Sequence, residues 1–386
     1  MFNTTFNLGI NKTAFDSAEL HAVIEAQTEP TKNRSLTQEE LRCFGQELDA
    51  IGQRALDEVG EEDAIYIHRI LKAVRYSELF GRLFLFASFI PPFWLLGTLL
   101  LSLSKILENM ELGHNVMHGQ YDWMNEPEFN GKTYEWDIVC TADNWRHGHN
   151  YLHHSYTNVK GMDDDVGYGL LRLFPEQRWR PFYLLQPLWA ALLALLFQWG
   201  IAIQELELGK VLSGRKSTAE LKQEFVPVRK KMLKQIAKDY LFFPLLAGPF
   251  FLNVLAGNLV ANLIRNVWTY VIIFCGHFTA DAEVFPYEVV GNESRGQWYL
   301  RQIRGSSNLR GGKLFHILSG NLSHQIEHHL FPTIPARRYA EMSVEVQGVC
   351  KKYGQNYNSG SLPVQFGQVL YRIFRHALPS SPVVAL

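Results

Sequence analysis

The chain of 386 residues contains little cysteine and no excess of positive charge. Its four cysteines lie far apart, and no two of them form a Cys-x-x-Cys pair. We therefore expect buried or free thiols on the reducing side of a membrane rather than disulfides. The formal net charge of −1 and the pI of about 6.9 provide no basic surplus, which argues against nucleic acid as a partner.

Sequence motifs that carry electrons are also missing. The chain has no His-Pro-Gly-Gly of the kind that binds haem, no Gly-x-Gly-x-x-Gly after a strand pattern and no ferredoxin-like run of cysteines. A reaction that consumes electrons must therefore obtain them from a separate protein. The start of the chain lacks a positively charged segment followed by a short apolar run, so we expect no cleavable signal peptide and an N-terminus that stays inside.

Long apolar tracts are present, and they are unevenly distributed. The mean hydropathy of −0.09 averages two unlike parts, because hydrophobic segments lie at about 76–113, 182–203 and 240–278. This pattern predicts an all-α integral membrane helical bundle with a substantial soluble part. Pro91-Pro92 interrupts the first segment, and a double proline favours a turn between two helices. We predict a hairpin with a short arm at 76–90 and a full-length arm at 93–113.

The second and third hydrophobic segments leave the number of membrane crossings open. Residues 204–239 between them are rich in lysine and arginine, which places them in the cytoplasm by the positive-inside rule. Turn residues break the third segment at Pro244, Gly248-Pro249 and Gly257-Asn258. If the histidine clusters described below share one side, either 182–203 is interfacial or re-entrant, or the third segment crosses once. We prefer the interfacial interpretation, which gives about four transmembrane helices.

Soluble segments flank the membrane part. Thr37 and Glu40 form a capping-box pattern ahead of an apolar stripe with helical spacing at Leu41, Phe44, Leu48, Ile51 and Ala55. The stripe can pack on the rest of the protein or lie on lipid, and we prefer packing. Amphipathic helices are predicted at 336–352 and 364–375, ahead of a ten-residue tail. We divide the chain into cytosolic amphipathic helices at 1–75, a membrane domain at 76–345, and a C-terminal cytosolic helix and tail at 346–386.

Histidines gather in three groups that a packing role does not explain. We call them box one (His114 and His118), box two (His149, His153 and His154) and box three (His324, His328 and His329). With 14 histidines in 386 residues, the pattern His-x-x-x-His-His should arise roughly 0.02 times in a random chain, whereas it arises twice. Chance is therefore a poor explanation.

The spacing within each box is suited to metal binding. Positions i, i+4 and i+5 of a helix share one face or neighbouring faces, so each box can direct its imidazoles into one small volume. Neutral imidazole suits iron among other first-row metals, and eight ligands exceed the four of a tetrahedral zinc site, which predicts two metal ions. Of the other histidines, we expect surface or structural roles for His21, His68 and His376, and surface positions or support of the ligands for His147 and His316.

The boxes and their flanks resemble those of the membrane fatty acyl-CoA desaturases. The matching residues are His114-x-x-x-His118, His149-x-x-x-His153-His154 and Gln325-x-x-His328-His329 followed by Leu-Phe-Pro, within residues 75–345. Flanks typical of the bacterial branch are Trp145-Arg146, Thr157-Asn158, Trp298, Gln302, Ser307-Asn308 and Gly320-Asn321. Within that branch the chain is most similar to the NADPH-dependent stearoyl-CoA delta-9 desaturases.

This resemblance implies a di-iron centre at the cytosolic ends of the transmembrane helices and a kinked apolar tunnel for the acyl chain. It adds His277, at the end of the last apolar tract, as a ninth ligand. Relatives carry an asparagine four residues earlier that contacts iron through water, whereas this chain has Ile273. That contact is therefore absent or comes from elsewhere, with Asn266 and Asn321 as candidates.

Box three and the residues that support the ligands leave alternatives open. The family permits His or Gln at the first position of box three, and here His324 and Gln325 are adjacent; we favour His324 as the ligand. Ligand imidazoles normally donate their second N–H to a carboxylate or carbonyl. The candidates for such support are Gln325, Asn321, Glu111, Asp143, Asp163, Asp164 and Glu327, and each carboxylate among them can equally be a solvated charge.

The function implied by the resemblance is O2-dependent insertion of a cis double bond into a saturated long-chain fatty acyl-CoA at delta-9. Electrons would come from NADPH through an external flavin and iron–sulfur reductase or a ferredoxin-type donor, with the site facing the cytoplasm at a bacterial inner membrane. Alternatives are a delta-6 or acyl-lipid desaturase and a related di-iron lipid hydroxylase, although the Gln-Ile-Glu-His-His-Leu-Phe-Pro sequence argues against hydroxylation. A transporter or metal-storage protein is disfavoured because no internal repeat is visible.

Overall fold

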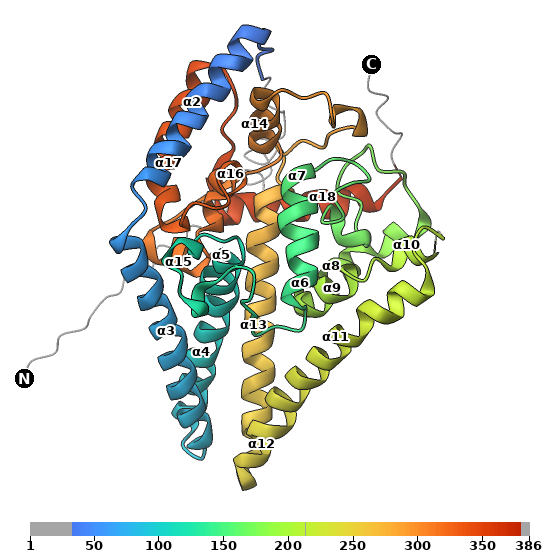
Figure 1. Ribbon diagram of the computed structural model, residues 1–386. Coiled ribbons are helices and arrows are strands. Elements are labelled where there is room, and N and C mark those ends of the chain that lie inside the picture. Colours follow the sequence, from blue (N-terminus) through green and yellow to red (C-terminus); the bar gives the residue numbers. More distant parts are fainter. Residues whose placement is uncertain (1–32, 213, 380–386) are drawn as a thin grey trace, which may run out of the picture.

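The protein is almost entirely helical. The computed structural model describes residues 33–212 and 214–379, and His21 lies outside this part. Among the described residues the regular strands are β1 (Asn308–Arg310) and β2 (Ser359–Ser361), which pair in parallel with Asn308 opposite Ser359. The predicted all-α class is therefore confirmed. Figure 1 shows two helical arms that project downward from a broader upper part.

The first described helix, α2 (Gln38–Asp57), packs on the upper part as predicted. Thr37 caps it, since its side chain accepts from the Glu40 N–H while the Glu40 side chain accepts from the Thr37 N–H. The predicted stripe is buried against α14 (Arg295–Arg304), α16 (Gln325–Leu330) and α17 (Tyr339–Lys352). The lipid-surface alternative for this stripe is therefore wrong.

The predicted hairpin is present, but its first arm is longer than expected. Helix α3 (Glu61–Phe86) has 26 residues and crosses the expected domain boundary at 75, because no helix-breaking residue separates its polar first half from its apolar second half. Pro91 then begins α4 (Pro91–Leu107). The two helices touch at Gly81 and Gly97, where a Cβ on Gly97 would lie 2.8 Å from the Leu85 nitrogen.

The third hydrophobic segment belongs to a second pair of helices. The lysine-rich stretch is largely helical, because α11 (Thr218–Ile236) continues through η7 (Ala237–Phe242) into α12 (Phe243–Leu246). The chain turns at η8 (Gly248–Phe250) and returns as α13 (Phe251–His277). The predicted break at Gly248-Pro249 is therefore confirmed, whereas the one at Gly257-Asn258 is wrong. Asn258 lies inside α13 and accepts a 2.7 Å hydrogen bond from Arg82 of α3.

A buried polar network joins the two pairs of helices. The Asp239 carboxylate of η7 accepts from Lys105 of α4 at 2.8 Å, from Asn262 of α13 at 3.0 Å and from Arg82 at 3.4 Å. A buried charge is costly unless it is paired, so these contacts constrain how α3, α4, η7 and α13 sit against one another. Helix α4 leads to box one and α13 ends at His277, so this network helps to fix the position of box one relative to His277.

The segment 182–203 does not form one straight helix. It comprises η6 (Pro181–Leu185), α8 (Gln186–Leu195) and α9 (Phe197–Gln204), and the helical axis bends by 102° between Leu195 and Phe197. Within the described ranges, one helix is long and apolar enough to cross a membrane, namely α13 together with its preceding turn. The bent pair of α8 and α9 would be a second candidate only if the pair is counted as one span.

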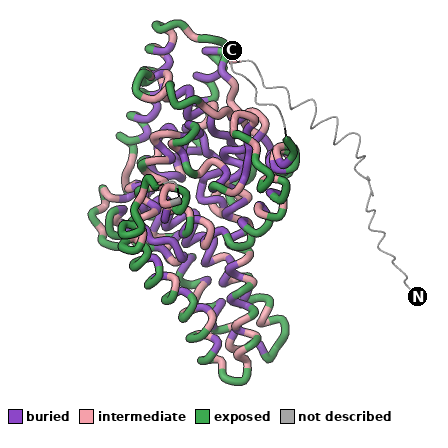
Figure 2. The backbone as a smooth tube through the Cα atoms, turned by 90° about the vertical axis from the view of Figure 1, so that its right-hand side faces the viewer, coloured by how far each residue is buried: buried purple, intermediate pink, exposed green. Residues whose placement is uncertain are grey.

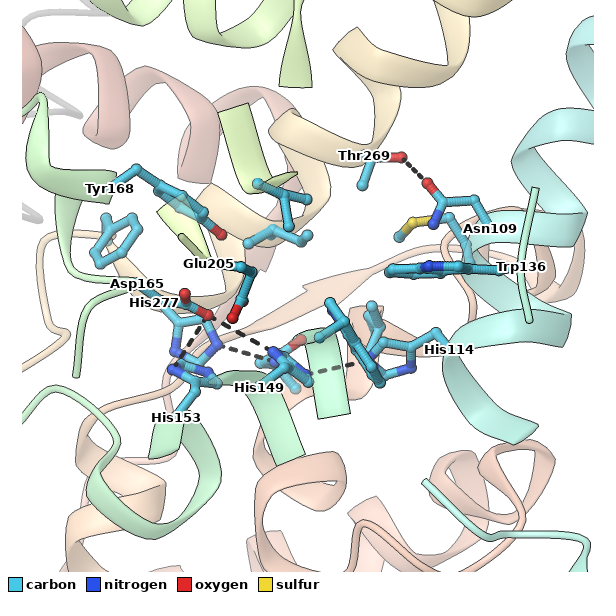
Figure 3. A pocket seen from close by; sticks show the side chains of 17 residues that line it. Asn109, His114, Trp136, His149, His153, Asp165, Tyr168, Glu205, Thr269 and His277 are labelled. Atoms are coloured by element: carbon cyan, nitrogen blue, oxygen red, sulfur yellow. Dashed lines mark hydrogen bonds and ion pairs between the residues drawn. The ribbon is translucent and has the colours of Figure 1, made fainter. Parts of the chain in front are cut away.

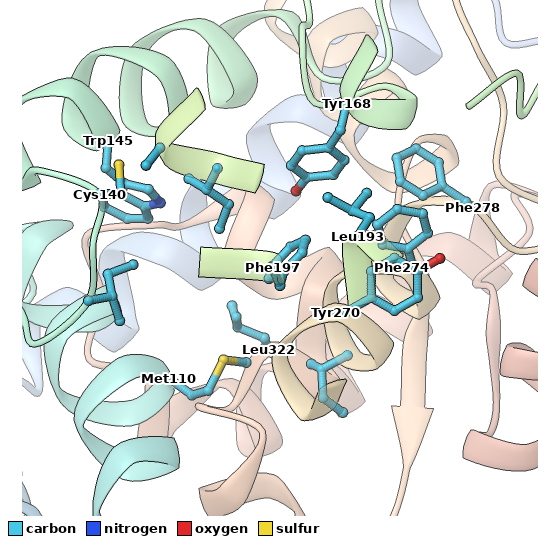
Figure 4. Packing of buried hydrophobic residues seen from close by; sticks show 14 of the residues in the cluster. Met110, Cys140, Trp145, Tyr168, Leu193, Phe197, Tyr270, Phe274, Phe278 and Leu322 are labelled. Atoms are coloured by element: carbon cyan, nitrogen blue, oxygen red, sulfur yellow. The ribbon is translucent and has the colours of Figure 1, made fainter. Parts of the chain in front are cut away.

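Short elements and two C-terminal helices complete the upper part. Phe197 and Phe274 belong to the largest buried cluster (Figure 4). Val369 and Ile373 of the last helix, α18 (Leu362–Ala377), are also part of this cluster. Figure 2 shows buried backbone concentrated in the upper part and exposed turns along the arms. The predicted helices at 336–352 and 364–375 are confirmed as α17 and α18. The remaining elements are η1 (Glu108–Gly113), α5 (His114–Met117), η2 (Asp122–Met124), η3 (Pro127–Phe129), α6 (Ala142–Trp145), η4 (Arg146–His153), α7 (His154–Tyr156), η5 (Gly167–Gly169), α10 (Leu208–Leu212), η9 (Tyr287–Val289), α15 (Lys313–Leu318), η10 (Leu322–His324), η11 (Ala336–Arg338) and α18 (Leu362–Ala377).

Candidate metal centre

Four helical segments bring the box histidines together. In box one, His114 begins α5 and His118 directly follows it. Box two lies on η4 and α7, box three lies on η10 and α16, and His277 is the last residue of α13. Both η1 and η4 are π-helical. Such wide turns are rare and occur often at functional sites. All of these histidines except His149 are less than a tenth exposed, and His149 is half-buried.

The imidazoles form two adjacent groups. Within each group, one possible ligand atom per residue lies within 4.8 Å of all the others. The first group is His114, His118, His149 and His328, and the second is His153, His277 and His329. His154 lies between them, because it forms a third such group with His328 and His329. The expectation of two neighbouring sites for metal ions thus agrees with the geometry.

Two pairs of imidazole nitrogens are separated by the distance expected for two ligands of the same metal ion. His114 Nε2 lies 3.4 Å from His149 Nε2, and His329 Nε2 lies 3.2 Å from His277 Nε2. Two imidazole nitrogens at about 2.1 Å from one metal are roughly 3.0 to 3.4 Å apart. Both pairs fit this range.

Contacts at Nδ1 leave Nε2 available on the same rings. His153 Nδ1 lies 3.0 Å from the Asp163 carboxylate, and His277 Nδ1 lies 3.2 Å from the Gly305 carbonyl oxygen. Equivalent acceptors are the Gln302 side-chain oxygen for His329 and the Asn115 side-chain oxygen for His114, both at 3.1 Å, and Asp165 for His149 at 3.6 Å. A ring that donates from Nδ1 presents its Nε2 lone pair to a metal.

Burial favours the neutral form of most rings. The pKa of His118 and that of His154 are held well below the usual value by burial and by neighbouring imidazoles. His153 differs, since burial lowers its pKa but the Asp163 and Asp165 carboxylates raise it to about 9. Neutral imidazole is the form that binds metal.

Buried nitrogens without partners show that the residues fit metal ions. His118 Nε2 and both ring nitrogens of His154 and His328 are buried and have no hydrogen-bond partner. A buried polar atom without a partner costs roughly 1 to 3 kcal/mol. Metal ions that accept one lone pair from each of these three rings would remove much of that cost.

The structure places Gln325, rather than the favoured His324, against the other histidines. Helix α16 begins at Gln325, and His324 has non-helical φ/ψ values of −104° and 55°, so the i, i+4, i+5 geometry does not extend to it. Its ring stacks on His316 with centroids 4.6 Å apart. Gln325 instead faces the cluster, because its side-chain nitrogen lies 3.0 Å from His277 Nε2.

The supporting carboxylates are Asp163 and Asp165 rather than Asp164. Asp163 and Asp165 contact box two, whereas the Asp164 side chain is 52% exposed and pairs with Lys210. The sequence showed three consecutive aspartates but not which of them turn inward. Thr157 and Gln302, noted only as family flanks, both contact His329 Nδ1 at 3.1 Å.

Other expected supports lie in separate contacts. Glu327 accepts from Asn308 and Tyr357, and Glu111 accepts from Asn321 and Tyr66. Neither Glu327 nor Asn321 is in hydrogen-bond contact with the histidines of the two groups, although Glu327 lies 4.0 Å from His324 Nδ1. Three further residues are also away from the cluster, since Asn266 donates to the Leu195 carbonyl, Asp143 pairs with Arg146, and His147 is exposed. The remaining histidines are His68, which contacts Glu126; His316, which contacts Ser323; and His376, which joins none of the groups.

An apolar cavity lies directly against the two histidine groups. Figure 3 shows His114, His149 and His153 along one side of it, with Trp136 and Tyr168 toward opposite ends. Apolar side chains that line the cavity include Met110, Ile201, Ile273, Phe278 and Leu322. Gln325 and Ile273 both face this space. The arrangement can hold an apolar chain beside metal ions.

Comparison with known proteins identifies the family to which the chain belongs. The family model for fatty acid desaturase matches residues 78–361. The chain is 45% identical over 348 residues to an NADPH-dependent stearoyl-CoA 9-desaturase of Mycobacterium tuberculosis, covering 89% of this chain and 82% of that protein. It is 30% identical over 288 residues to an sn-1 linoleoyl-lipid 6-desaturase of Synechocystis, covering 71% and 77% of the two chains. The chain therefore belongs to the fatty acid desaturase family and is an oxidoreductase.

Proposed function

We propose that the protein is an O2-dependent di-iron desaturase that inserts a cis double bond at delta-9 of a saturated long-chain fatty acyl-CoA. The observation that carries this proposal is the pair of adjacent histidine groups facing one apolar cavity. The 45% identity to a stearoyl-CoA 9-desaturase supports the substrate and the position. Apolar side chains, among them Met110, Ile201, Ile273 and Leu322, line the cavity beside the histidines, which suits a saturated chain.

The ligands divide between two iron ions. His114, His118, His149 and His328 would hold one ion, and His153, His277 and His329 the other. His154 completes the set between them, and Gln325 takes the first position of box three in place of His324. When bound, the two ions supply O2 activation, so that two hydrogens leave adjacent methylenes while O2, two electrons and two protons yield two water molecules. Asp163 and Gln302 fix the rings of His153 and His329.

The cavity wall would decide which methylenes react. Ile273 and Leu322 line the cavity together with the histidines, so an apolar chain that fills it excludes water from the metal ions. Ile273 stands where the desaturase resemblance places a polar asparagine, and here it adds apolar surface. Positioning against a fixed metal pair is how such a site selects one carbon–carbon bond.

A second cavity offers a place for the charged end of an acyl-CoA. It has a volume of about 650 Å³, lies between α3, α4 and α11, and meets the apolar cavity at Trp136, which lines both. Six cationic side chains line it together with five carboxylates: the cations are Arg75, Lys105, Lys230, Lys231, Lys234 and Lys238. Lysines and arginines bind phosphate groups, so the phosphates of coenzyme A fit here while the acyl chain passes Trp136.

The arms would anchor the protein in a bacterial inner membrane with the iron site facing the cytoplasm. We propose four crossings, formed by α3, α4, the rod from α11 to α12, and α13, with α8 and α9 at the interface. Large apolar side chains are exposed on these arms, including Leu83, Leu96, Leu245 and Leu252. Exposed apolar surface of this extent is expected where lipid replaces water.

Electrons would come from a separate partner. The 45% identical relative is named as NADPH-dependent, and this sequence carries no motif of its own for a nicotinamide, flavin or iron–sulfur cofactor. An external reductase with flavin and iron–sulfur groups, or a ferredoxin-type donor, would deliver two electrons for each double bond.

A desaturase that acts at delta-6 or on an acyl lipid is the second candidate. The 30% identity to an sn-1 linoleoyl-lipid 6-desaturase favours it. The lysine-rich cavity favours an acyl-CoA substrate over an acyl lipid, because coenzyme A carries more phosphate charge than a typical lipid headgroup.

Expression in a desaturase-deficient bacterium tests the proposal. Double bonds in total fatty acids are located by mass spectrometry, with and without a co-expressed NADPH-dependent reductase, and His153→Ala is the control. New 9-cis chains that disappear in the control support the proposal. Double bonds at carbon 6 favour the second candidate, and a product carrying an added oxygen atom refutes desaturation.

A further inference from the structure

A third cavity lies beside η4, which carries box two, and is lined mainly by carboxylate side chains. It has a volume of about 280 Å³. Six carboxylates line it: Asp143, Asp164, Asp165, Glu205, Glu207 and Glu224. No lysine or arginine in the described part of the chain is among its lining residues. Its charge is therefore opposite to that of the lysines that line the cavity between α3, α4 and α11.

The acidic cavity and the apolar cavity share two residues. Asp165 and Glu205 line both. The Asp165 carboxylate lies 3.6 Å from His149 Nδ1 and 3.7 Å from His153 Nδ1. Figure 3 shows the Glu205 carboxylate directed toward His149. Solvent in the acidic cavity is thus separated from the histidines by two carboxylates.

Gly148 makes this close approach possible. A Cβ at position 148 would lie 2.2 Å from one Glu205 carboxylate oxygen and 2.3 Å from the other. Any side chain there would push Glu205 away from the box-two helix. The glycine beside His149 therefore allows a carboxylate to rest directly on the backbone that carries the ligands.

The carboxylates at the outer end of the acidic cavity, away from the histidines, have different partners from those at the inner end, next to the histidines. Lys210 pairs with Asp164, and Lys216 pairs with Glu207 at 3.1 Å and with Glu224 at 2.5 Å. Asp165 at the inner end contacts imidazoles and accepts from Gln204 at 2.6 Å. For Glu205 the described residues provide no hydrogen-bond or ion-pair partner. At the inner end, Asp165 and Glu205 therefore form no direct ion pair with a lysine or arginine among the described residues.

Iron ions need a route to ligands that are closed off from solvent. His154 is 6% and His328 0% exposed, and both carry unpartnered ring nitrogens. A divalent cation is attracted more strongly by the acidic cavity than by the cavity between α3, α4 and α11, where six cationic side chains stand beside five carboxylates. The ligand atoms of His149, His153 and Asp165 also lie within 4.8 Å of one another, so a carboxylate and two imidazoles can share an ion at the junction.

We propose that the acidic cavity is the entry route for iron, with Glu205 and Asp165 passing divalent cations from solvent to box two. This inference rests on the proposed di-iron function. In this proposal the two charged cavities admit different molecules: the anionic substrate would enter the lysine-lined cavity, and the metal cation would enter the acidic cavity. No bond other than metal coordination changes, and the ion exchanges water for carboxylate and then for imidazole.

Iron uptake by the purified apoprotein tests the proposal. Iron is removed from detergent-solubilised full-length protein by chelation under anaerobic conditions, and Fe2+ is added. Samples are stopped with excess chelator at successive times, and bound iron per chain is measured by mass spectrometry. The variants are Glu205→Gln, which removes the charge with little change in size, and Glu207→Gln. Lys234→Gln in the lysine-lined cavity is the matched control.

We expect Glu205→Gln to slow uptake at least tenfold and Glu207→Gln several-fold, with the same final iron content as the unaltered protein. Raising the salt concentration should slow uptake in the unaltered protein and have less effect on Glu205→Gln. Uptake at the unaltered rate in both variants overturns the route, as does slowing in Lys234→Gln. A lower final iron content at an unchanged rate makes Glu205 a ligand instead. If the unaltered protein takes up no iron, the di-iron function itself is refuted.

Discussion

The contact between Asp163 and His153 leads to a prediction about one of the two metal ions. Asp163 is 5% exposed. Its carboxylate accepts from the Asn158 backbone N–H at 2.8 Å and from the Asp165 backbone N–H at 3.0 Å, and it lies 3.0 Å from His153 Nδ1. Asp163→Asn keeps the size of the side chain but removes the charge that orients His153.

Loss of such a support typically lowers metal affinity by roughly 10- to 100-fold, which corresponds to about 1.4 to 2.7 kcal/mol. Of the two groups assigned to the iron ions, that of His153, His277 and His329 contains the affected ring. We therefore expect Asp163→Asn to bind one iron ion as tightly as the unaltered protein and the second 10- to 100-fold more weakly.

Anaerobic equilibrium dialysis of Fe2+ against a chelator of known affinity measures both steps. Asp164→Asn is the matched control, because the neighbouring side chain is 52% exposed and pairs with Lys210; its iron affinities should be unchanged. Equal weakening of both ions in Asp163→Asn would contradict the division into two groups. Affinities within twofold of the unaltered protein would contradict the role of Asp163.

Four further outcomes follow from the structure. Gln325→Ala should lower iron content and turnover, whereas His324→Ala should retain both; the opposite result, measured by metal analysis and product assay, restores His324 as the ligand. Phe44→Ala removes a fully buried ring of α2 and should destabilise the protein by about 3 to 5 kcal/mol in detergent melting experiments, whereas exposed Gln53→Ala should change little. Gly97→Val places atoms against the Leu85 backbone and should cost about 1 to 3 kcal/mol, with a lower yield of membrane-inserted protein than Ser102→Ala. Lys234→Gln should raise KM for an acyl-CoA several-fold with kcat unchanged, and an unchanged KM would remove this lysine from coenzyme A binding.

Local sequence features determined most of the elements. Thr37 and Glu40 specified the start of α2, and the double proline specified the turn before α4, because caps and breakers act within a few residues. The start of α3 was missed because its polar and apolar halves read as separate segments, although neither contains a residue that ends a helix. Likewise helix α11 was not predicted, and the partners of Lys231 and Lys238, Glu135 and Asp137, lie about 100 residues earlier.

For the metal centre, the sequence by itself determined which histidines gather, since spacing alone places box one and box two on helical faces. Only the tertiary structure shows that Gln325 rather than His324 faces His277, because that depends on where α16 begins. It also decided that Asp163 and Asp165 turn toward the histidines while Asp164 faces solvent, and that Glu205 rests on Gly148. These contacts join residues from different elements, and no periodicity within one segment encodes them.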